Sequence, residues 1–255
     1  MPKFTAGGKQ LEADLLVFDK DGLMFDSEQF WIELINERCG NLLGYLSPGE
    51  IVRWARLMGA DTVLGEGGET VTTYVDPLGI CACAAPREEI SITASFLVSV
   101  NGWHWHQARA AAEEVFGKSN QTLDLRKALR PQPGFVALMR RLRELDVPYG
   151  VATSDTLERT KESMELYDAW DKVRFVITPE EVVRGKPAPD MLVRASEITG
   201  VPLSRIAMVG DSIVDVRMAE SAQSIGIGVS ADPVMRKRME PYAAVVLNSL
   251  EELVF

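Results

Sequence analysis

The stretch from Leu15 to Ser27 reads LLVFDKDGLMFDS, a short apolar run that ends in two carboxylates and a glycine. Its four apolar residues, Leu15 to Phe18, are typical of a strand buried on both faces of a parallel sheet. Ligands of open α/β sheets bind beyond the carboxyl ends of the strands, so Asp19 and Asp21 stand where chemistry is usually done. Asp and Gly are also ordinary turn residues, and the stretch alone fits a structural turn equally well.

The chain from residue 131 onward indicates the fold class. Apolar runs predict strands at 149–153, 173–177, 206–210, 225–229 and 244–247, and helical periodicity predicts helices at 134–146, 155–167, 189–199 and 212–222. Strands that alternate with helices at this spacing predict an α/β fold with a doubly wound, Rossmann-like parallel sheet. The turn-forming sequence PQPG at 131–134 marks the start of this region.

Residues 27–130 interrupt the alternation after its first strand. Helical periodicity predicts helices over 28–42, from Pro48 onward, and over 87–116 with a break near Asn101 and Gly102. Residues 61–87 are rich in Gly and Thr and are predicted to be a long loop, so we expect no strand between 28 and 130. We therefore predict an α/β core of residues 1–26 and 131–255 and a helical cap of residues 27–130. The cap leaves and re-enters at the catalytic edge of the sheet, where it can close over a site.

Composition narrows the class of protein. The 255 residues include 37 acidic and 27 basic side chains, for a net charge of −10, and this is the opposite of a nucleic-acid-binding surface. An anionic membrane surface would also repel the chain, and no apolar run is long enough for a signal peptide or a transmembrane helix. The odd set Cys39, Cys81 and Cys83 is interpreted as reduced thiols in a cytoplasmic protein. An anionic substrate would need local positive charge at its site.

Polar groups of complementary kinds follow the predicted strands. They are, in order, Asp19 and Asp21, Thr153 and Ser154, Lys186 within GKPAPD, and Asp211 and Asp215 within VGDSIVD. Each is common in structural turns, but their ordered occurrence at strand ends points to one site. Carboxylates gathered there would repel one another unless a cation lay among them, and Mg²⁺ prefers such hard oxygen ligands.

With these motifs in this order, the chain resembles the haloacid dehalogenase-like (HAD) superfamily of hydrolases. The likeness is to its phosphatase branch with a helical cap after the first strand, as in phosphoglycolate phosphatases and β-phosphoglucomutases. It covers residues 14–27 and roughly 131–250, whereas residues between them resemble the family only in position and helical character. The resemblance implies a Mg²⁺-dependent phosphatase that acts on a small phosphorylated metabolite through an aspartyl-phosphate.

The resemblance also implies roles for the reacting groups. Asp19 would attack phosphorus, and Asp21 would serve as general acid and then as general base. Lys186 would offset the repulsion between Asp19 and the phosphate. Thr153 and Ser154 would bind phosphoryl oxygens. Dehalogenases of the family lack the second carboxylate, so Asp21 favours phosphoester chemistry.

The same resemblance implies a set of metal ligands. Asp19, the backbone carbonyl of Asp21, and Asp211 would bind Mg²⁺ directly, and Asp215 would bind it directly or through water. Lys20 lies between the two aspartates of the first motif. Adjacent residues need not face the same way, and we do not expect its side chain to contact substrate.

Two other functions remain open from the sequence. A hexose phosphomutase uses the same core, but mutases of the family carry a histidine at cap entry where this chain has Trp31. A phospho-signalling receiver module also forms a Mg²⁺-assisted aspartyl-phosphate. The spacing of Asp19 and Asp21, the large cap and the length of the chain oppose the receiver.

The leaving group would be recognised by cap residues. The candidates are Trp31, Arg53, Arg56, and the two histidines of the WHWH cluster, His104 and His106. Tryptophans at such spacing more often belong to a core, and arginines on one helix face are more often solvated. Phosphoglycolate and sugar phosphates both fit as substrates, and the sequence does not indicate an oligomeric state.

Overall fold

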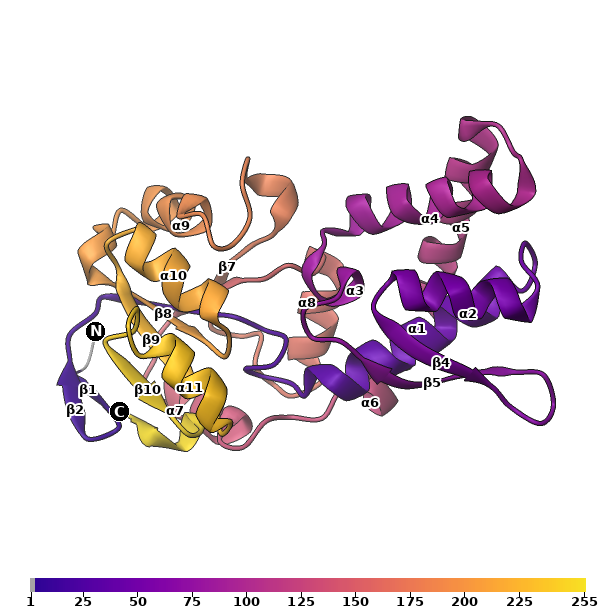
Figure 1. The fold of residues 1–255 in the computed structure, drawn as a ribbon. Helices are drawn as coiled ribbons and strands as arrows, with labels where there is room; N and C mark the ends of the chain where they lie inside the picture. The colour runs from indigo at the N-terminus through magenta and orange to yellow at the C-terminus, as the bar shows by residue number, and fades with distance from the viewer. Residues whose placement is uncertain (1–2) are drawn as a thin grey trace. The chain divides into compact units, whose positions relative to one another are not determined.

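The computed structural model describes residues 3–255 and places Leu15–Phe18 inside a six-stranded parallel sheet (Figure 1). The strand order is β10-β9-β8-β3-β6-β7. The strands are β3 (Leu15–Phe18), β6 (Tyr149–Ala152), β7 (Val173–Ile177), β8 (Ile206–Gly210), β9 (Ile225–Val229) and β10 (Val245–Leu247). All four residues of β3 are buried, as expected for a strand covered on both faces.

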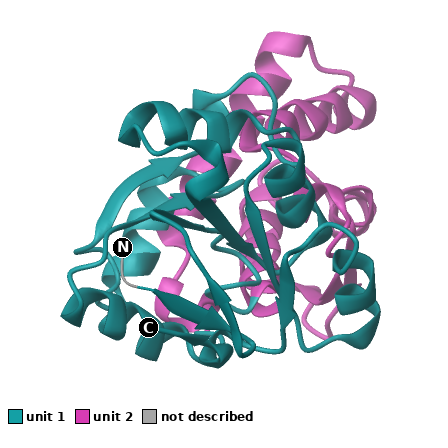
Figure 2. Cartoon of the chain, turned by 90° about the vertical axis from the view of Figure 1, so that its left-hand side faces the viewer, with its two compact units in different colours: residues 1–26, 131–255 teal, residues 27–130 magenta. Residues whose placement is uncertain are grey.

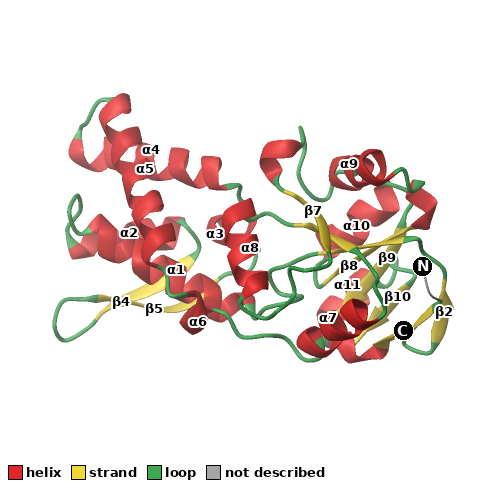
Figure 3. Ribbon diagram, turned by 180° about the vertical axis from the view of Figure 1, so that it is seen from behind, coloured by secondary structure: helices red, strands yellow, loops and turns green. Residues whose placement is uncertain are grey.

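Helices alternate with these strands along the chain (Figure 3). They are α7 (Phe135–Glu144), α8 (Leu157–Glu165), α9 (Asp190–Thr199), α10 (Ile213–Ser221) and α11 (Pro233–Met239), with short 3₁₀ turns η1 (Pro179–Glu181), η2 (Leu203–Arg205) and η3 (Leu250–Glu252). The predicted doubly wound parallel sheet is confirmed. From β3 the chain order proceeds to β6 and β7 on one side and to β8, β9 and β10 on the other. The order therefore reverses at β3, and such switch points are where open α/β sheets bind ligands.

A small antiparallel sheet at the chain ends was not expected from the sequence. It has the order β11-β1-β2 and consists of β1 (Phe4–Ala6), β2 (Lys9–Leu11) and β11 (Leu253–Val254). Gly7 and Gly8 connect β1 to β2 with φ of 57° and 78°. Two residues of positive φ form the tight turn that matches strand twist, so this hairpin depends on the glycine pair.

The chain divides into two compact units, residues 1–26 with 131–255, and residues 27–130 (Figure 2). The second unit contains α1 (Ser27–Leu42), α2 (Pro48–Leu57), β4 (Ala60–Leu64), β5 (Thr70–Val75), α3 (Ile80–Cys83), α4 (Pro86–Asn101), α5 (Trp105–Thr122) and α6 (Leu125–Ala128). Gly102, with φ of 66°, ends α4 and supplies the helix break expected there. Among residues 3–255, no helix combines the length and apolar character needed to cross a membrane.

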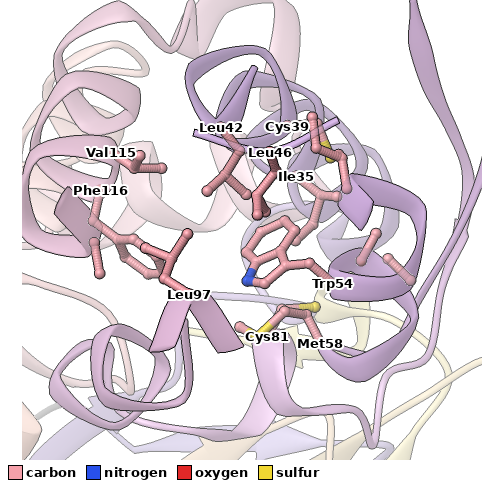
Figure 4. Packing of buried hydrophobic residues seen from close by; sticks show 14 of the residues in the cluster. Ile35, Cys39, Leu42, Leu46, Trp54, Met58, Cys81, Leu97, Val115 and Phe116 are labelled. Carbon is pink, nitrogen blue, oxygen red and sulfur yellow. The ribbon is translucent and has the colours of Figure 1, made fainter. Parts of the chain in front are cut away.

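A hydrophobic core holds the second unit together (Figure 4). Trp54 is fully buried in it, and its indole Nε1 donates a hydrogen bond to Thr93 Oγ1 at 3.1 Å. The surrounding side chains include Leu97 and Met58, which come from α4 and the end of α2. This unit therefore has an interior of its own, separate from the sheet.

The prediction that residues 61–87 form a loop without strands is wrong. Strands β4 and β5 form an antiparallel hairpin. Two of its buried positions hold threonines, Thr62 and Thr72, whose hydroxyl oxygens lie 3.1 Å apart, and the other two hold Ala60 and Val75. The backbone N–H of Thr72 also donates to Oδ1 of Asn36 on α1 at 2.9 Å. Apolar residues such as Val63 are exposed, so the alternation of apolar and polar residues that indicates a strand is weak here.

Candidate active site

The candidate site lies at the carboxyl ends of three adjacent strands, β6, β3 and β8. Asp19 follows β3, and its backbone N–H donates to the carbonyl of Val209 on β8 at 2.9 Å. Thr153 follows β6, and Asp211 follows β8. Parallel strands end at the same edge of a sheet, so the apolar runs of the sequence carry these polar groups to one place.

Three of the predicted ligands form one acidic cluster. Oxygen atoms of Asp19, Asp211 and Asp215 all lie within 4.8 Å of one another. The ammonium of Lys186 lies 2.7 Å from Oδ1 of Asp19 and 2.7 Å from Oδ1 of Asp215. Two groups therefore come from strand ends, one from the first turn of α10, and one from the loop before α9.

The cluster has the chemistry of a divalent cation site. When all three carboxyl groups are ionised, the single ammonium leaves two excess negative charges within this cluster. Oδ1 of Asp211 is buried and accepts no hydrogen bond from the described residues. Carboxylate oxygens are hard ligands, which divalent cations such as Mg²⁺ prefer in proteins. The residues present therefore fit the metal that the sequence implied.

Two glycines leave room for the acidic side chains. A Cβ atom at Gly22 would collide with the carboxylate of Asp211, and Gly22 also has φ of 89°. A Cβ atom at Gly210 would collide with Asp215. Ser212 then holds Asp215 in place, since its hydroxyl donates to Oδ2 of that carboxylate at 2.6 Å. Sequence reasoning missed Ser212, although Ser three residues before Asp is a helix-capping pattern that could have identified it.

Burial and crowding perturb the acids of the cluster. Burial raises the pKa of Asp19 to about 6, with Lys186 opposing the rise and the charge of Asp215 adding to it. Burial, with the charges of Asp19 and Asp215, raises the pKa of Asp211 well above its ordinary value. Burial alone would lower the pKa of Lys186, but the two carboxylates it contacts outweigh burial and raise it. The ammonium is therefore charged whenever the cluster is assembled.

These shifts predict how stability depends on pH without metal. In the folded protein the pKa of Asp19 is about 6, against 3.8 for the unperturbed group, so the folded state binds the extra proton between these values. The free energy of unfolding in EDTA is therefore expected to increase as pH falls from 7 to 5. This contribution from Asp19 is lost as pH rises through 6. Thermal unfolding of the protein and of Asp19→Asn measures this. The variant should show a smaller rise, and equal rises in both would contradict the assignment.

Asp21 does not join the acidic cluster with its side chain. Its Oδ1 lies 2.5 Å from Nζ of Lys20. Lys20 is fully buried, which agrees with the expectation that its side chain does not contact substrate. Its ammonium also pairs with Oδ2 of Asp155 at 2.9 Å, and Oδ1 of Asp155 lies 3.2 Å from Nε of Arg159. Sequence reasoning missed Asp155 and Arg159, because an acidic residue just before a helix is a common capping residue.

The second predicted motif forms the turn between β6 and α8. Thr153 is buried, and its Oγ1 accepts a hydrogen bond from the backbone N–H of Asp155 at 3.0 Å. Ser154 is half-buried. The hydroxyl of Thr153 is thereby fixed in orientation next to the carboxyl edge of the sheet. The binding of phosphoryl oxygens by Thr153 and Ser154 stays a prediction.

The candidate residues for the leaving group all lie in the second unit. Arg53 and Arg56 are exposed on α2, and the Arg53 guanidinium lies 6.0 Å from the ring centre of Phe96. His104 and His106 are exposed at the start of α5. The remaining candidate, Trp31 on α1, is half-buried and packs edge-on against Phe30. Their part in recognition also stays a prediction.

A family model described as haloacid dehalogenase-like hydrolase matches residues 13–223, a span that includes the ends of β3, β6 and β8. The chain belongs to the haloacid dehalogenase-like hydrolases. The resemblance drawn from the sequence motifs is thus confirmed at the level of the family. In this haloacid dehalogenase-like hydrolase, the acidic cluster and the ammonium of Lys186 lie together at one edge of the sheet.

Curated relatives of this hydrolase are named as phosphatases. The chain is 28% identical over 245 residues to a probable pseudouridine-5'-phosphatase of Drosophila melanogaster, covering 92% of this chain and 89% of that one. It is also 28% identical over 101 residues to a phosphoglycolate phosphatase of Neisseria meningitidis, covering 40% of this chain and 43% of the relative.

Solved structures share the fold. A predicted phosphoglycolate phosphatase of Haemophilus somnus aligns with a TM-score of 0.64 at 14% identity, covering 94% of this chain and 96% of that chain. A β-phosphoglucomutase-like protein of Thermotoga maritima aligns with a TM-score of 0.58 at 20% identity, covering 94% and 95%. At such identities the likeness concerns the fold alone, so it does not favour the mutase.

Proposed function

We propose that this haloacid dehalogenase-like hydrolase is a Mg²⁺-dependent phosphatase that forms an aspartyl-phosphate on Asp19 and acts on a small phosphorylated metabolite. The observation that carries the proposal is the position of Asp19 in the acidic cluster beside Lys186, with a second carboxylate two residues away. Membership of a hydrolase family and relatives named as phosphatases support a phosphoric monoester hydrolase.

Residues 1–26 and 131–255 would form the catalytic core, and residues 27–130 the cap that recognises the leaving group. We also propose a cytoplasmic location. Cys39, Cys81 and Cys83 are all free thiols, and burial raises the pKa of Cys39 and of Cys81 to about 12. Free thiols of this kind are typical of proteins in a reducing compartment.

In the first half-reaction, a carboxylate oxygen of Asp19 attacks phosphorus in line with the leaving oxygen. An O–P bond forms to Asp19 as the bond from phosphorus to the leaving oxygen breaks, and Asp21 donates its proton to that oxygen. Lys186 and the hydroxyl of Thr153 hold the phosphoryl oxygens. Mg²⁺ bound by Asp19, Asp211, Asp215 and the backbone carbonyl of Asp21 would neutralise charge on the phosphoryl group.

In the second half-reaction, Asp21, now a carboxylate, takes a proton from a water molecule that attacks phosphorus. The bond from phosphorus to Asp19 breaks, inorganic phosphate leaves, and both aspartates return to their starting states. One water is consumed for each ester cleaved. Lys186 already contacts Asp19 at 2.7 Å before substrate binds, which would limit the reorganisation needed in the reaction.

Phosphate release from 4-nitrophenyl phosphate tests the proposal. Activity should be absent after dialysis against EDTA and should return with Mg²⁺. The protein should then be assayed with phosphoglycolate, sugar phosphates and pseudouridine 5'-phosphate, since the names of its relatives point to such esters. Undiminished turnover in EDTA would contradict the metal role. A stable phosphoprotein without turnover would instead favour the receiver module, and transfer of phosphate between sugar positions would favour the mutase.

A further inference from the structure

A buried group of four charged side chains lies beside the acidic cluster, and the mechanism above assigns a role only to its Asp21 carboxyl group. It comprises Lys20, Asp21, Asp155 and Arg159. Two positive and two negative charges balance in it. Lys20 and Asp155 are both buried, so removing either one would take from the other a buried partner of opposite charge. Loss of such a partner strongly destabilises the folded state.

The group has one end that reaches the surface. The side chain of Asp21 is 14% exposed, whereas that of Lys20 is 0% and that of Asp155 is 3% exposed. Lys20 therefore cannot reach a substrate itself. It contacts Oδ1 of Asp21, and a carboxyl group held through one oxygen can carry its transferable proton on the other.

Asp155 connects two parts of the candidate site. Its carboxylate binds the ammonium of Lys20, which belongs to the loop after β3, while its backbone N–H donates to Thr153 Oγ1 in the turn after β6. Its Oδ1 also accepts from the backbone N–H of Thr156 at 2.8 Å. Arg159, one helical turn along α8, lies 3.2 Å from that same oxygen. The carboxylate is thus fixed from several directions.

We propose that Asp155 is a positioning residue, which acts through Lys20 to hold the carboxyl group of Asp21 in the orientation for proton transfer. The inference rests on the proposed function, because it assigns Asp21 the role of acid and base. Lys20 lies in contact with both carboxylates, so the chain of contacts runs from α8 to the reacting group without a gap.

Leaving groups of different acidity separate a positioning role from a merely structural one. kcat/KM of an enzyme with a covalent intermediate reports the first half-reaction, in which Asp21 acts as the acid. Phenyl phosphate needs that proton more than 4-nitrophenyl phosphate, whose leaving group is stable as an anion. In Asp155→Asn, kcat/KM for phenyl phosphate should fall by about 10- to 100-fold and that for 4-nitrophenyl phosphate by less than about 3-fold. Lys20→Met should show the same selective loss.

Two further variants keep the result interpretable. Asp155→Asn with Arg159→Gln removes one charge of each sign, so the buried group stays neutral if Asp155→Asn alone does not fold. Glu89→Gln is the matched control, since Glu89 pairs with Arg38 at 2.6 Å in a buried site of the other unit. Glu89→Gln should change kcat/KM for phenyl phosphate and for 4-nitrophenyl phosphate by the same factor.

An equal fall for both esters in a folded Asp155 variant, or no fall, would overturn the inference and leave the proposed function standing. Absence of turnover by the unaltered protein on either ester would overturn the proposed function itself. Circular dichroism and thermal unfolding establish that each variant is folded before the ratio is measured.

Discussion

Replacing Asp19 with Asn is expected to abolish phosphate release, with a loss of at least about 10⁴-fold in kcat, the order seen when a catalytic nucleophile is removed. An amide has nearly the size of a carboxylate but does not attack phosphorus. Asp19 is positioned by its backbone hydrogen bond to Val209 and by the ammonium of Lys186. Since the backbone bond does not depend on the side chain, the variant should keep its fold. Phosphate release measured with Mg²⁺ present checks the prediction.

The pKa of Asp19 gives the experiment an internal check. Burial raises that pKa to about 6, so the carboxylate is destabilised in the folded metal-free protein at neutral pH. Asp19→Asn should therefore unfold at a temperature no lower than the unaltered protein in EDTA at pH 7.5. Asp14→Asn is the control, because Asp14 is exposed and pairs with Arg205 at 2.9 Å on the opposite end of β3. Turnover by Asp19→Asn comparable to that of Asp14→Asn would refute the nucleophile.

The strand ends could be predicted from the sequence because their signal is local. Leu15–Phe18 and Ile206–Gly210 are continuous apolar runs, and each is followed at once by an aspartate. Once such runs are strands of one parallel sheet, their carboxyl ends must share an edge. The proximity of Asp19 to Asp211 therefore followed from the strand pattern and did not require knowledge of any side-chain contact.

The contacts of Lys20 and Asp155 could not be predicted in this way. Lys20 and Asp155 are 135 residues apart in the sequence, and the residues around each do not indicate the direction of its side chain. The hairpin β4–β5 escaped for a different reason. Two of its buried positions hold Thr62 and Thr72 while Val63 and Val71 are exposed, so the alternation of apolar and polar residues that indicates a half-buried strand is weak here.

Replacing Lys186 with Met is expected to lower kcat/KM by about 10²- to 10³-fold. Lys186 is the cation in contact with both Asp19 and Asp215, and without it the cluster carries three uncompensated carboxylates. Bringing a phosphate dianion to Asp19 then costs more, since each pair of unit charges 4 Å apart repels by about 4 kcal/mol at an effective dielectric of 20. Bound Mg²⁺ would offset part of this cost, which is why the expected loss is smaller than for Asp19→Asn.

The measurement compares Lys186→Met with Lys172→Met, a variant that removes a lysine from the same unit. Lys172 pairs with the exposed carboxylate of Asp146 at 2.6 Å, and surface pairs of this kind contribute little. Lys172→Met should therefore keep the activity of the unaltered protein. Because Lys186 also counteracts repulsion within the acidic cluster, its loss should lower the unfolding temperature in EDTA, and added Mg²⁺ should restore part of that loss. Full activity in Lys186→Met would contradict the role of Lys186 in the reaction. The metal alone would then offset the repulsion between Asp19 and the phosphate.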